Sequence, residues 1–155
     1  MVDEDLDPDL DDPQRERVYA SEDLTLAHGR TFRRFAEVEA YLADVVSDPW
    51  WIDDLGERWG VAPPLDVTLV RRSRSARSSA AEVGRPVIHL RDGHWTAAVL
   101  LHELAHLVAR DPEPHGPIFC GVLCDLVGRH MGFPASVELR AALVAAGVTV
   151  AQPRP

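Results

Sequence analysis

The sequence has little that would place this protein in a membrane, outside the cell or on nucleic acid. No run approaches the roughly 18 uncharged apolar residues of a membrane helix. The N-terminus lacks the basic and apolar regions of a secretion signal. Two cysteines are too few for a disulfide framework. With 16 Lys and Arg against 25 Asp and Glu, the chain lacks the basic excess of a nucleic-acid-binding protein. We therefore expect a cytoplasmic protein that makes no membrane contact.

Negative charge is concentrated at the N-terminus. Residues 1–13 contain seven acidic residues and no basic one. The other 18 acidic residues face 16 basic ones, so the rest of the chain is close to neutral. We expect residues 1–13 to form a disordered, solvated tail, because blocks of like charge repel and bury little apolar surface. A chain of this length suits one domain, which we place at residues 14–150, followed by a short C-terminal tail at residues 151–155.

Hydrophobic periodicity predicts a mixture of helices and strands in this domain. Helices are expected at residues 35–46, 95–109, about 117–131 and near 135–146, and strands at residues 17–20, 65–70 and 86–90. Between them we expect an aromatic-rich connection at residues 50–60, with its tryptophans in the core, and a long hairpin loop at residues 71–85. This order predicts the α+β class. We expect a small antiparallel or mixed sheet packed on the helix at residues 95–109, with further helices at the C-terminus.

The most informative motif is an H-E-x-x-H run, His102 to His106, within the helix at residues 95–109. Glu103 is the only charged residue in that stretch, and a buried carboxylate is costly unless it is paired. Residues four apart lie on one helix face, so His102 and His106 can bind one ion. Glu103 would project beside the ion and act as general base on a zinc-bound water, whose pKa falls to about 7. The motif predicts one zinc ion, with Glu103 as the catalytic residue.

A catalytic zinc site uses three protein ligands and keeps one position open. His115 follows the H-E-x-x-H run by nine residues, beyond the turn at residues 111–114 and just before Gly116-Pro117, where a new helix is expected to begin. We predict that His115 is the third ligand. The alternative is an exposed His115, with Asp125 or Glu138 completing the site.

The two parts of this motif resemble a known family. Residues 99–106, VLLHELAH, followed by residues 115–120, HGPIFC, are similar to the core of SprT-like (Spartan-type) zinc metallopeptidases, which pair an H-E-x-x-H helix with a later H-G-x-x-F segment. The opening residues 12–20, DPQRERVYA, also resemble a group of small actinobacterial metallohydrolases. The resemblance implies a zincin-like minimal metallopeptidase core, zinc bound by His102, His106 and His115, and Glu103 as general base. This chain has no four-cysteine zinc ribbon, so the DNA–protein-crosslink role of some SprT-like proteins is not carried over.

Other polar residues are candidates for supporting roles. We expect Cys120 and Cys124 to be buried free thiols. Candidate oxyanion-stabilising residues are Tyr19, Tyr41, Arg91 and His130. The basic loop contains Arg71, Arg72, Arg74, Arg77 and Arg85. We interpret it as a solvated loop in preference to a nucleic-acid site.

These residues together predict a zinc-dependent peptidase that acts on a protein or peptide substrate. One alternative within this class is an ImmA-like regulatory peptidase that cleaves a single repressor. Two alternatives come from other classes: a metal-dependent ribonuclease, and a metal-binding regulatory protein without catalysis.

Overall fold

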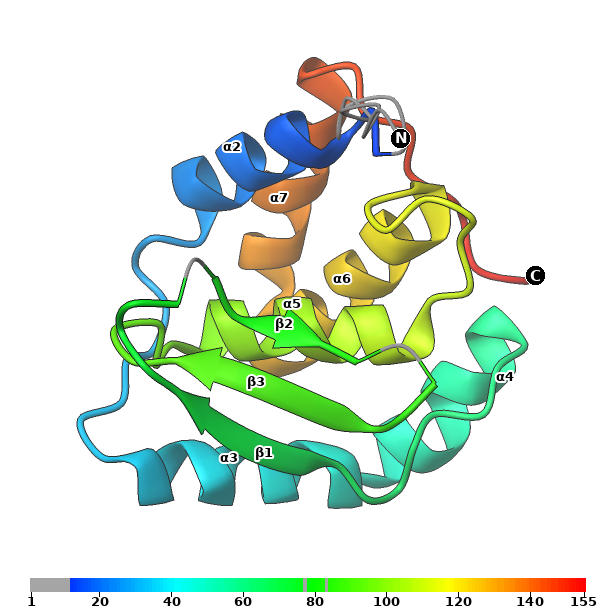
Figure 1. The fold of residues 1–155 in the computed structure, drawn as a ribbon. Helices are drawn as coiled ribbons and strands as arrows, with labels where there is room; N and C mark the ends of the chain where they lie inside the picture. The colour runs from blue at the N-terminus through cyan, green and yellow to red at the C-terminus, as the bar shows by residue number, and fades with distance from the viewer. Residues whose placement is uncertain (1–11, 77, 83) are drawn as a thin grey trace, which may run out of the picture.

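The chain folds into a small three-stranded sheet with helices around it, which is an α+β arrangement (Figure 1). The computed structural model describes residues 12–76, 78–82 and 84–155. The helices are α2 (Arg15–Thr25), α3 (Phe35–Ser47), the π-helix η1 (Trp50–Leu55), α4 (Gly56–Trp59), α5 (Ala97–Val108), α6 (Pro117–His130) and α7 (Phe133–Ala145). The strands are β1 (Thr68–Arg72), β2 (Ala80–Ala81) and β3 (Val87–Arg91). None of the helices in these ranges is both long enough and apolar enough to cross a membrane.

The sheet has the strand order β1-β3-β2, so the last strand lies in the middle. β3 pairs in parallel with β1, where Thr68 lies opposite Val87, and antiparallel with β2, where Ala81 lies opposite Ile88. The prediction of one hairpin loop at residues 71–85 is therefore wrong. Parallel neighbours cannot be joined by a tight turn. The chain instead runs back along the far edge as β2, and the hairpin joins β2 to β3, where the Glu82 N–H donates to the Val87 carbonyl (2.9 Å).

Two other local predictions are corrected by the structure. Residues 17–20, expected to be a strand, lie inside α2, where Val18 and Ser21 are buried at helical spacing. Residues 50–59, expected to be an aromatic-rich connection, form the helices η1 and α4, which end at Gly60, whose φ of 65° is in the left-handed region. Burial of Trp51 and Trp59 in the core was predicted correctly.

α5 is the central helix of the domain. Thr96 caps it, because its hydroxyl accepts a hydrogen bond from the Val99 N–H (3.1 Å). The helix packs against β2, β3 and α6, and eight of its residues are buried: Ala97, Leu100, Leu101, His102, Glu103, Leu104, Ala105 and Val108. Figure 1 shows α5 passing behind the sheet. The three helices predicted at residues 35–46, 95–109 and 117–131 are confirmed with small shifts at their ends. The C-terminal helix begins at Phe133, two residues earlier than predicted.

Candidate metal centre

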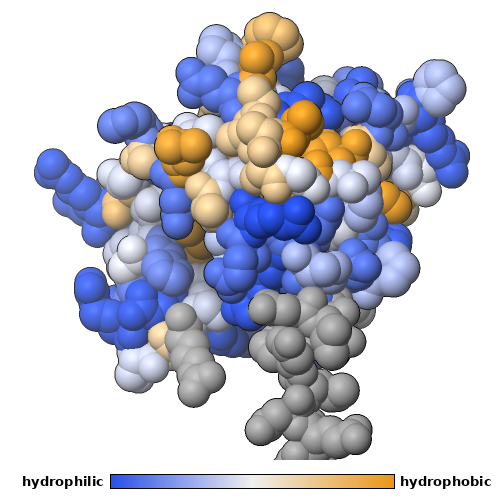
Figure 2. All heavy atoms as spheres, turned by 90° about the horizontal axis from the view of Figure 1, so that it is seen from above, coloured by the Kyte–Doolittle hydropathy of each residue, from blue (hydrophilic) through white to orange (hydrophobic). Residues whose placement is uncertain are grey.

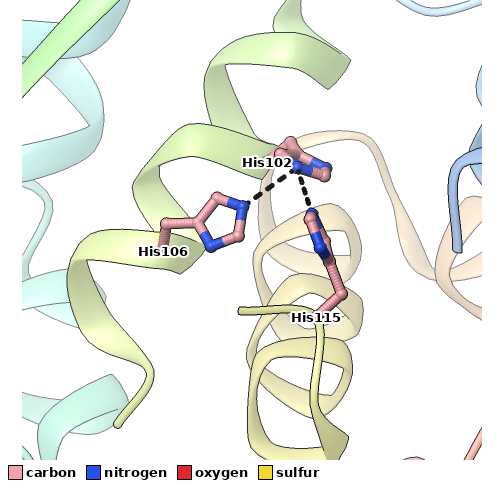
Figure 3. Close-up of side chains that lie close together, drawn as sticks. All are labelled: His102, His106 and His115. Atoms are coloured by element: carbon pink, nitrogen blue, oxygen red, sulfur yellow. Dashed lines mark hydrogen bonds between the residues drawn. The ribbon is translucent and has the colours of Figure 1, made fainter. Parts of the chain in front are cut away.

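Three imidazoles converge on one point beside α5. His102 and His106 lie one turn apart on that helix, and His115 comes from the turn before α6 (Figure 3). The Nε2 atom of His102 lies 3.2 Å from that of His106 and 3.3 Å from that of His115. One nitrogen from each ring lies within 4.8 Å of the other two. The structure thus brings the three predicted ligands together.

The two alternative ligands lie elsewhere. The Asp125 carboxylate accepts hydrogen bonds from the Arg58 guanidinium (2.9 Å) and from the Trp59 indole N–H (2.8 Å). Glu138 is exposed on α7. Neither acid belongs to the histidine cluster, so His115 is the residue that completes it.

The corner that carries His115 is built around Asp111. The Asp111 carboxylate accepts hydrogen bonds from the backbone N–H groups of Ile118 (3.3 Å) and Phe119 (2.6 Å), and so satisfies free donors at the start of α6. A Cβ atom at position 116 would lie 2.7 Å from the Cγ atom of Asp111, so a larger residue there would displace the Asp111 carboxylate. Pro117 is the first residue of the helix, where its missing N–H costs nothing. The H-G-P sequence thus fixes His115 immediately before a capped helix.

Two carboxylates from the N-terminal segment bind the outer nitrogens of two of these histidines. Glu22 on α2 lies 2.7 Å from the Nδ1 atom of His102, and Asp12 lies 2.5 Å from the Nδ1 atom of His115. Asp12 also accepts a hydrogen bond from the His115 backbone N–H (3.1 Å). Asp12 was assigned to the solvated tail, but it is buried in the folded domain. The rest of that tail, residues 1–11, lies outside the described residues.

These carboxylates determine which ring nitrogen faces the centre. An ionised carboxylate only accepts hydrogen bonds, so the Nδ1 atoms of His102 and His115 carry a proton, and in the neutral ring the lone pair then lies on Nε2. The two Nε2 atoms face each other 3.3 Å apart, a contact that needs either a shared proton or a metal ion between them. Two nitrogens on one tetrahedral zinc ion, each at about 2.0–2.1 Å, are separated by roughly 3.3–3.4 Å. The separations of His102 from His106 and from His115 therefore fit a bound metal ion. Imidazole donors suit zinc, copper, iron and nickel.

Burial and charge act differently on the three histidines. Burial is the main cause that lowers the pKa of His106 to about 2, with a further contribution from the neighbouring rings. Burial also lowers the pKa of His115, and the Asp12 carboxylate only partly offsets it. Burial disfavours the charged form of His102 as well, but Glu22 outweighs it and the pKa of His102 is raised. His106 and His115 are therefore held in the neutral form that binds metals.

Two aromatic rings enclose the cluster. Phe119, the aromatic residue of the H-G-P-I-F sequence, is fully buried, and its ring centroid lies 4.3 Å from that of His106 and 5.0 Å from those of His102 and His115. Tyr19 on α2 stacks on His102 at 5.5 Å and meets His115 edge-on at 5.0 Å. The imidazoles are thus packed between two rings, which restricts their rotation.

The cluster opens into a cleft of about 790 Å³. Glu103, His106, His115 and Tyr19 line it together with residues 78–82 and 109–114. Glu103 is only 6% exposed, and burial is the main cause that raises its pKa. Glu22 adds to this rise, while His102, a backbone hydrogen bond from Ala81 and the charge of Arg72 oppose it. A carboxylate whose pKa is raised therefore lies in the same cleft as the histidines.

A second hollow, of about 930 Å³, lies between α6 and α7 and contains none of these histidines. Phe133, Val137 and Val144 line it and are 76%, 48% and 62% exposed. Figure 2 shows that apolar residues also gather among polar ones on the face of the molecule seen from above. The cleft beside α5 is therefore distinguished by its chemistry and not by its size.

The structure separates the four candidate oxyanion-stabilising residues. Tyr19 lies in the cleft with the histidines. Tyr41 packs against Phe32 and His130, away from the cleft. The Arg91 guanidinium donates to the backbone carbonyl groups of Arg74 and Ala76. Of the four, Tyr19 alone lies against the histidine cluster.

Two of the five arginines at residues 71–85 make side-chain contacts within the protein. Arg71 forms an ion pair with Asp92 (2.8 Å), and its guanidinium lies over the ring of Trp95. Arg72 donates to the Ser78 carbonyl (2.9 Å). Arg77 lies outside the described residues. These contacts hold the side chains of Arg71 and Arg72 against the domain.

Cys120 and Cys124 are buried free thiols, as predicted. Burial raises the pKa of Cys120 to about 12 and that of Cys124 to about 11, so neither is a reactive thiolate. Their side chains contribute packing in α6 and no metal ligand.

Sequence reasoning missed the carboxylate partners, Asp12 and Glu22, and the place of Tyr19 over the rings. Asp12 and Tyr19 belong to the opening segment that resembles the small metallohydrolases, and that resemblance was the one available signal. Comparison of the chain with protein-family models, with curated proteins and with solved structures finds no match.

Proposed function

We propose that this protein is a zinc-dependent hydrolase that cleaves amide bonds, with a zincin-like, SprT-like core. One observation carries the proposal. The Nε2 atoms of His102 and His115 face each other 3.3 Å apart, with His106 beside them and Glu103 in the same cleft. Three imidazoles with an adjacent carboxylate are the donor set of a catalytic zinc site, in which the fourth position stays open.

When bound, zinc would polarise the carbonyl under attack and lower the pKa of water to about 7. The protein's own contribution is the position and proton affinity of Glu103. Its carboxylate lies in the cleft, where it accepts a proton from the attacking water and returns it to the leaving amine. The raised pKa of Glu103 suits a group that must both take up and release a proton near neutral pH.

The edge of the sheet favours a peptide as the substrate. β2 pairs with β3 along one side, and residues 78–82 line the cleft along the other. The Glu82 N–H points toward β3, so the preceding N–H of Ala81 is directed to the opposite side, where it meets Glu103. With the Ala81 N–H taken by Glu103, an extended peptide would pair with the other outward backbone groups of this edge and so be held against the metal centre.

The test compares two substitutions of glutamate by glutamine in the same cleft. Glu103→Gln should keep its zinc and lose peptide hydrolysis by about 10²–10⁴-fold, since the general base is removed. Glu113→Gln, which also lines the cleft but lies outside the histidine cluster, should hydrolyse as the parent does. Metal content is measured on purified protein, and hydrolysis is measured on a library of unfolded proteins and peptides.

The outcomes separate the proposal from its alternatives. Zinc at one equivalent without turnover on any peptide would indicate a metal-binding regulatory protein. Cleavage of structured RNA would indicate a ribonuclease. If Glu103→Gln hydrolyses peptides as well as the parent, the proposed mechanism is wrong.

A further inference from the structure

We propose that Asp12 and Glu22 are positioning residues for the metal ligands, and that docking of the N-terminal segment, residues 12–25, is coupled to metal binding. This inference rests on the proposed metal centre and adds to it the N-terminal segment that orients two of its ligands. The three ligands come from α5 and the corner before α6, whereas the groups that orient two of them come from the other end of the chain.

The orienting contacts are short and buried. The side chains of His102 and Glu22 are 7% and 12% exposed, and those of His115 and Asp12 are 5% and 10% exposed. Asp12 also accepts a hydrogen bond from the backbone of His115, so it holds both the ring and the chain that carries it. Few competing water molecules reach hydrogen bonds at such exposure, so these contacts hold the rings firmly.

The segment is anchored independently of the histidine rings by Gln14. Its Nε2 atom donates to the His115 carbonyl (3.0 Å), and its Oε1 atom accepts from the Thr149 N–H (2.7 Å). Gln14 therefore ties the segment to the ligand corner and to the C-terminal part of the chain, without contact to an imidazole nitrogen. Farther along α2, Tyr19 lies across the rings of His102 and His115.

The carboxylates do two things that metal binding requires. They keep the proton on Nδ1, so that Nε2 is free to bind the ion, and they fix the rotation of each ring. They also add negative charge beside a dication. Loss of such a partner typically weakens metal binding by about 10–100-fold. Among the described residues no carboxylate pairs with His106, which is held by α5 and by stacking on Phe119.

Coupling follows from thermodynamic reciprocity. If the docked segment raises zinc affinity by some factor, bound zinc raises the docking equilibrium by the same factor. The amide hydrogens of α2 should therefore exchange more slowly in the zinc-bound protein than in the metal-free protein.

The experiment measures zinc affinity by competition with a chelator, using the full-length chain. Glu22→Gln and Asp12→Asn are compared with Glu16→Gln and Asp23→Asn, which make the same changes at exposed positions on α2. We expect zinc to bind about 10–100-fold more weakly to the first pair. The control pair should stay within about twofold of the parent, because a single exposed charge is screened by solvent.

A second variant and a second readout separate positioning from general stability. Gln14→Ala leaves all three ligands and both acids in the chain but loosens the segment, and it too should weaken zinc binding. Hydrogen exchange of α2 should show zinc-induced protection in the parent and much less in Glu22→Gln. If Glu22→Gln fails to fold, Asp12→Asn, which lies outside the helix, carries the same test.

Each outcome decides the inference. Parent-like zinc affinity in both Glu22→Gln and Asp12→Asn would overturn it and leave the proposed function standing. Unchanged α2 exchange upon zinc binding would overturn the coupling. If the parent itself binds no zinc, the proposed function fails first and this inference fails with it.

Discussion

Replacing Phe119 by alanine should damage the domain and the metal centre together. Its ring is fully buried and lies within 5.0 Å, centroid to centroid, of all three imidazoles. Removing a buried phenylalanine side chain costs about 3–5 kcal/mol, because contact and burial are lost and a cavity is left. We expect the histidine rings to tilt into that cavity, so that their nitrogens no longer converge.

Urea unfolding of the metal-free protein gives the first measurement. With an m-value of about 2 kcal/mol/M, a loss of about 4 kcal/mol lowers the unfolding midpoint by roughly 2 M. Zinc titration of the folded variant gives the second measurement. Zinc at 100 times its Kd should stabilise the parent by about 2.7 kcal/mol, and the same concentration should stabilise Phe119→Ala much less.

Leu55→Ala is the matched control, since Leu55 is equally buried but lies on η1. It should lose about 2–5 kcal/mol and keep the parent's zinc affinity. If Phe119→Ala binds zinc as tightly as Leu55→Ala does, the ring is ordinary core packing, and its proposed support of the ligands is wrong.

Two further predictions concern the close approach of Gly116 to Asp111 and the buried His130 ring. Gly116→Ala should destabilise the protein by about 1–3 kcal/mol, because the new methyl group would lie 2.7 Å from the Asp111 Cγ atom. Thermal unfolding measures this loss, and a neutral result would mean that Asp111 moves away freely. Burial lowers the pKa of His130, whose Nε2 atom has no hydrogen-bond partner among the described residues. The unfolded chain therefore binds a proton below pH 6.5 that the folded protein does not, and stability falls as the pH falls below that value. His130→Leu should reduce the difference in unfolding free energy between pH 7.5 and pH 5.5, measured on metal-free protein, and an unchanged difference would contradict this assignment.

The histidine cluster could be predicted from sequence because its geometry is local. His102 and His106 lie one helical turn apart, and His115 follows after a short turn fixed by Gly116 and Pro117. Helix periodicity and turn chemistry are properties of a few consecutive residues, so they can be read from the sequence. The same reasoning identified Glu103.

The partners of these ligands could not be predicted, because they are distant in sequence. Glu22 lies 80 residues from His102, and Asp12 lies 103 residues from His115. An acidic residue near a chain end is usually solvated, so the acidic composition of residues 1–13 favoured the assignment of Asp12 to a tail. The assignment of residues 17–20 to a strand failed for a related reason. The packing of α2 against α7 overrides the weak strand preference of Val18 and Tyr19.

Strand topology was beyond local reasoning as well. The alternation in β1 and β3 predicted two strands, but the hairpin expected between them is wrong, because the strands are parallel. Their relative direction depends on β2, which has only two residues, Ala80 and Ala81, and is too short to show a period.

The Gln14 side chain bonds to residues far along the sequence, and this has a consequence for the synthesis of the protein. Gln14 is translated 135 residues before its partner Thr149. At about 5–20 residues per second, that interval lasts roughly 7–27 s. Asp12 and Glu22 are likewise translated before His115 and His102, the residues whose rings they contact. The contacts of Gln14 around the histidine cluster are therefore complete only after Thr149 has been translated.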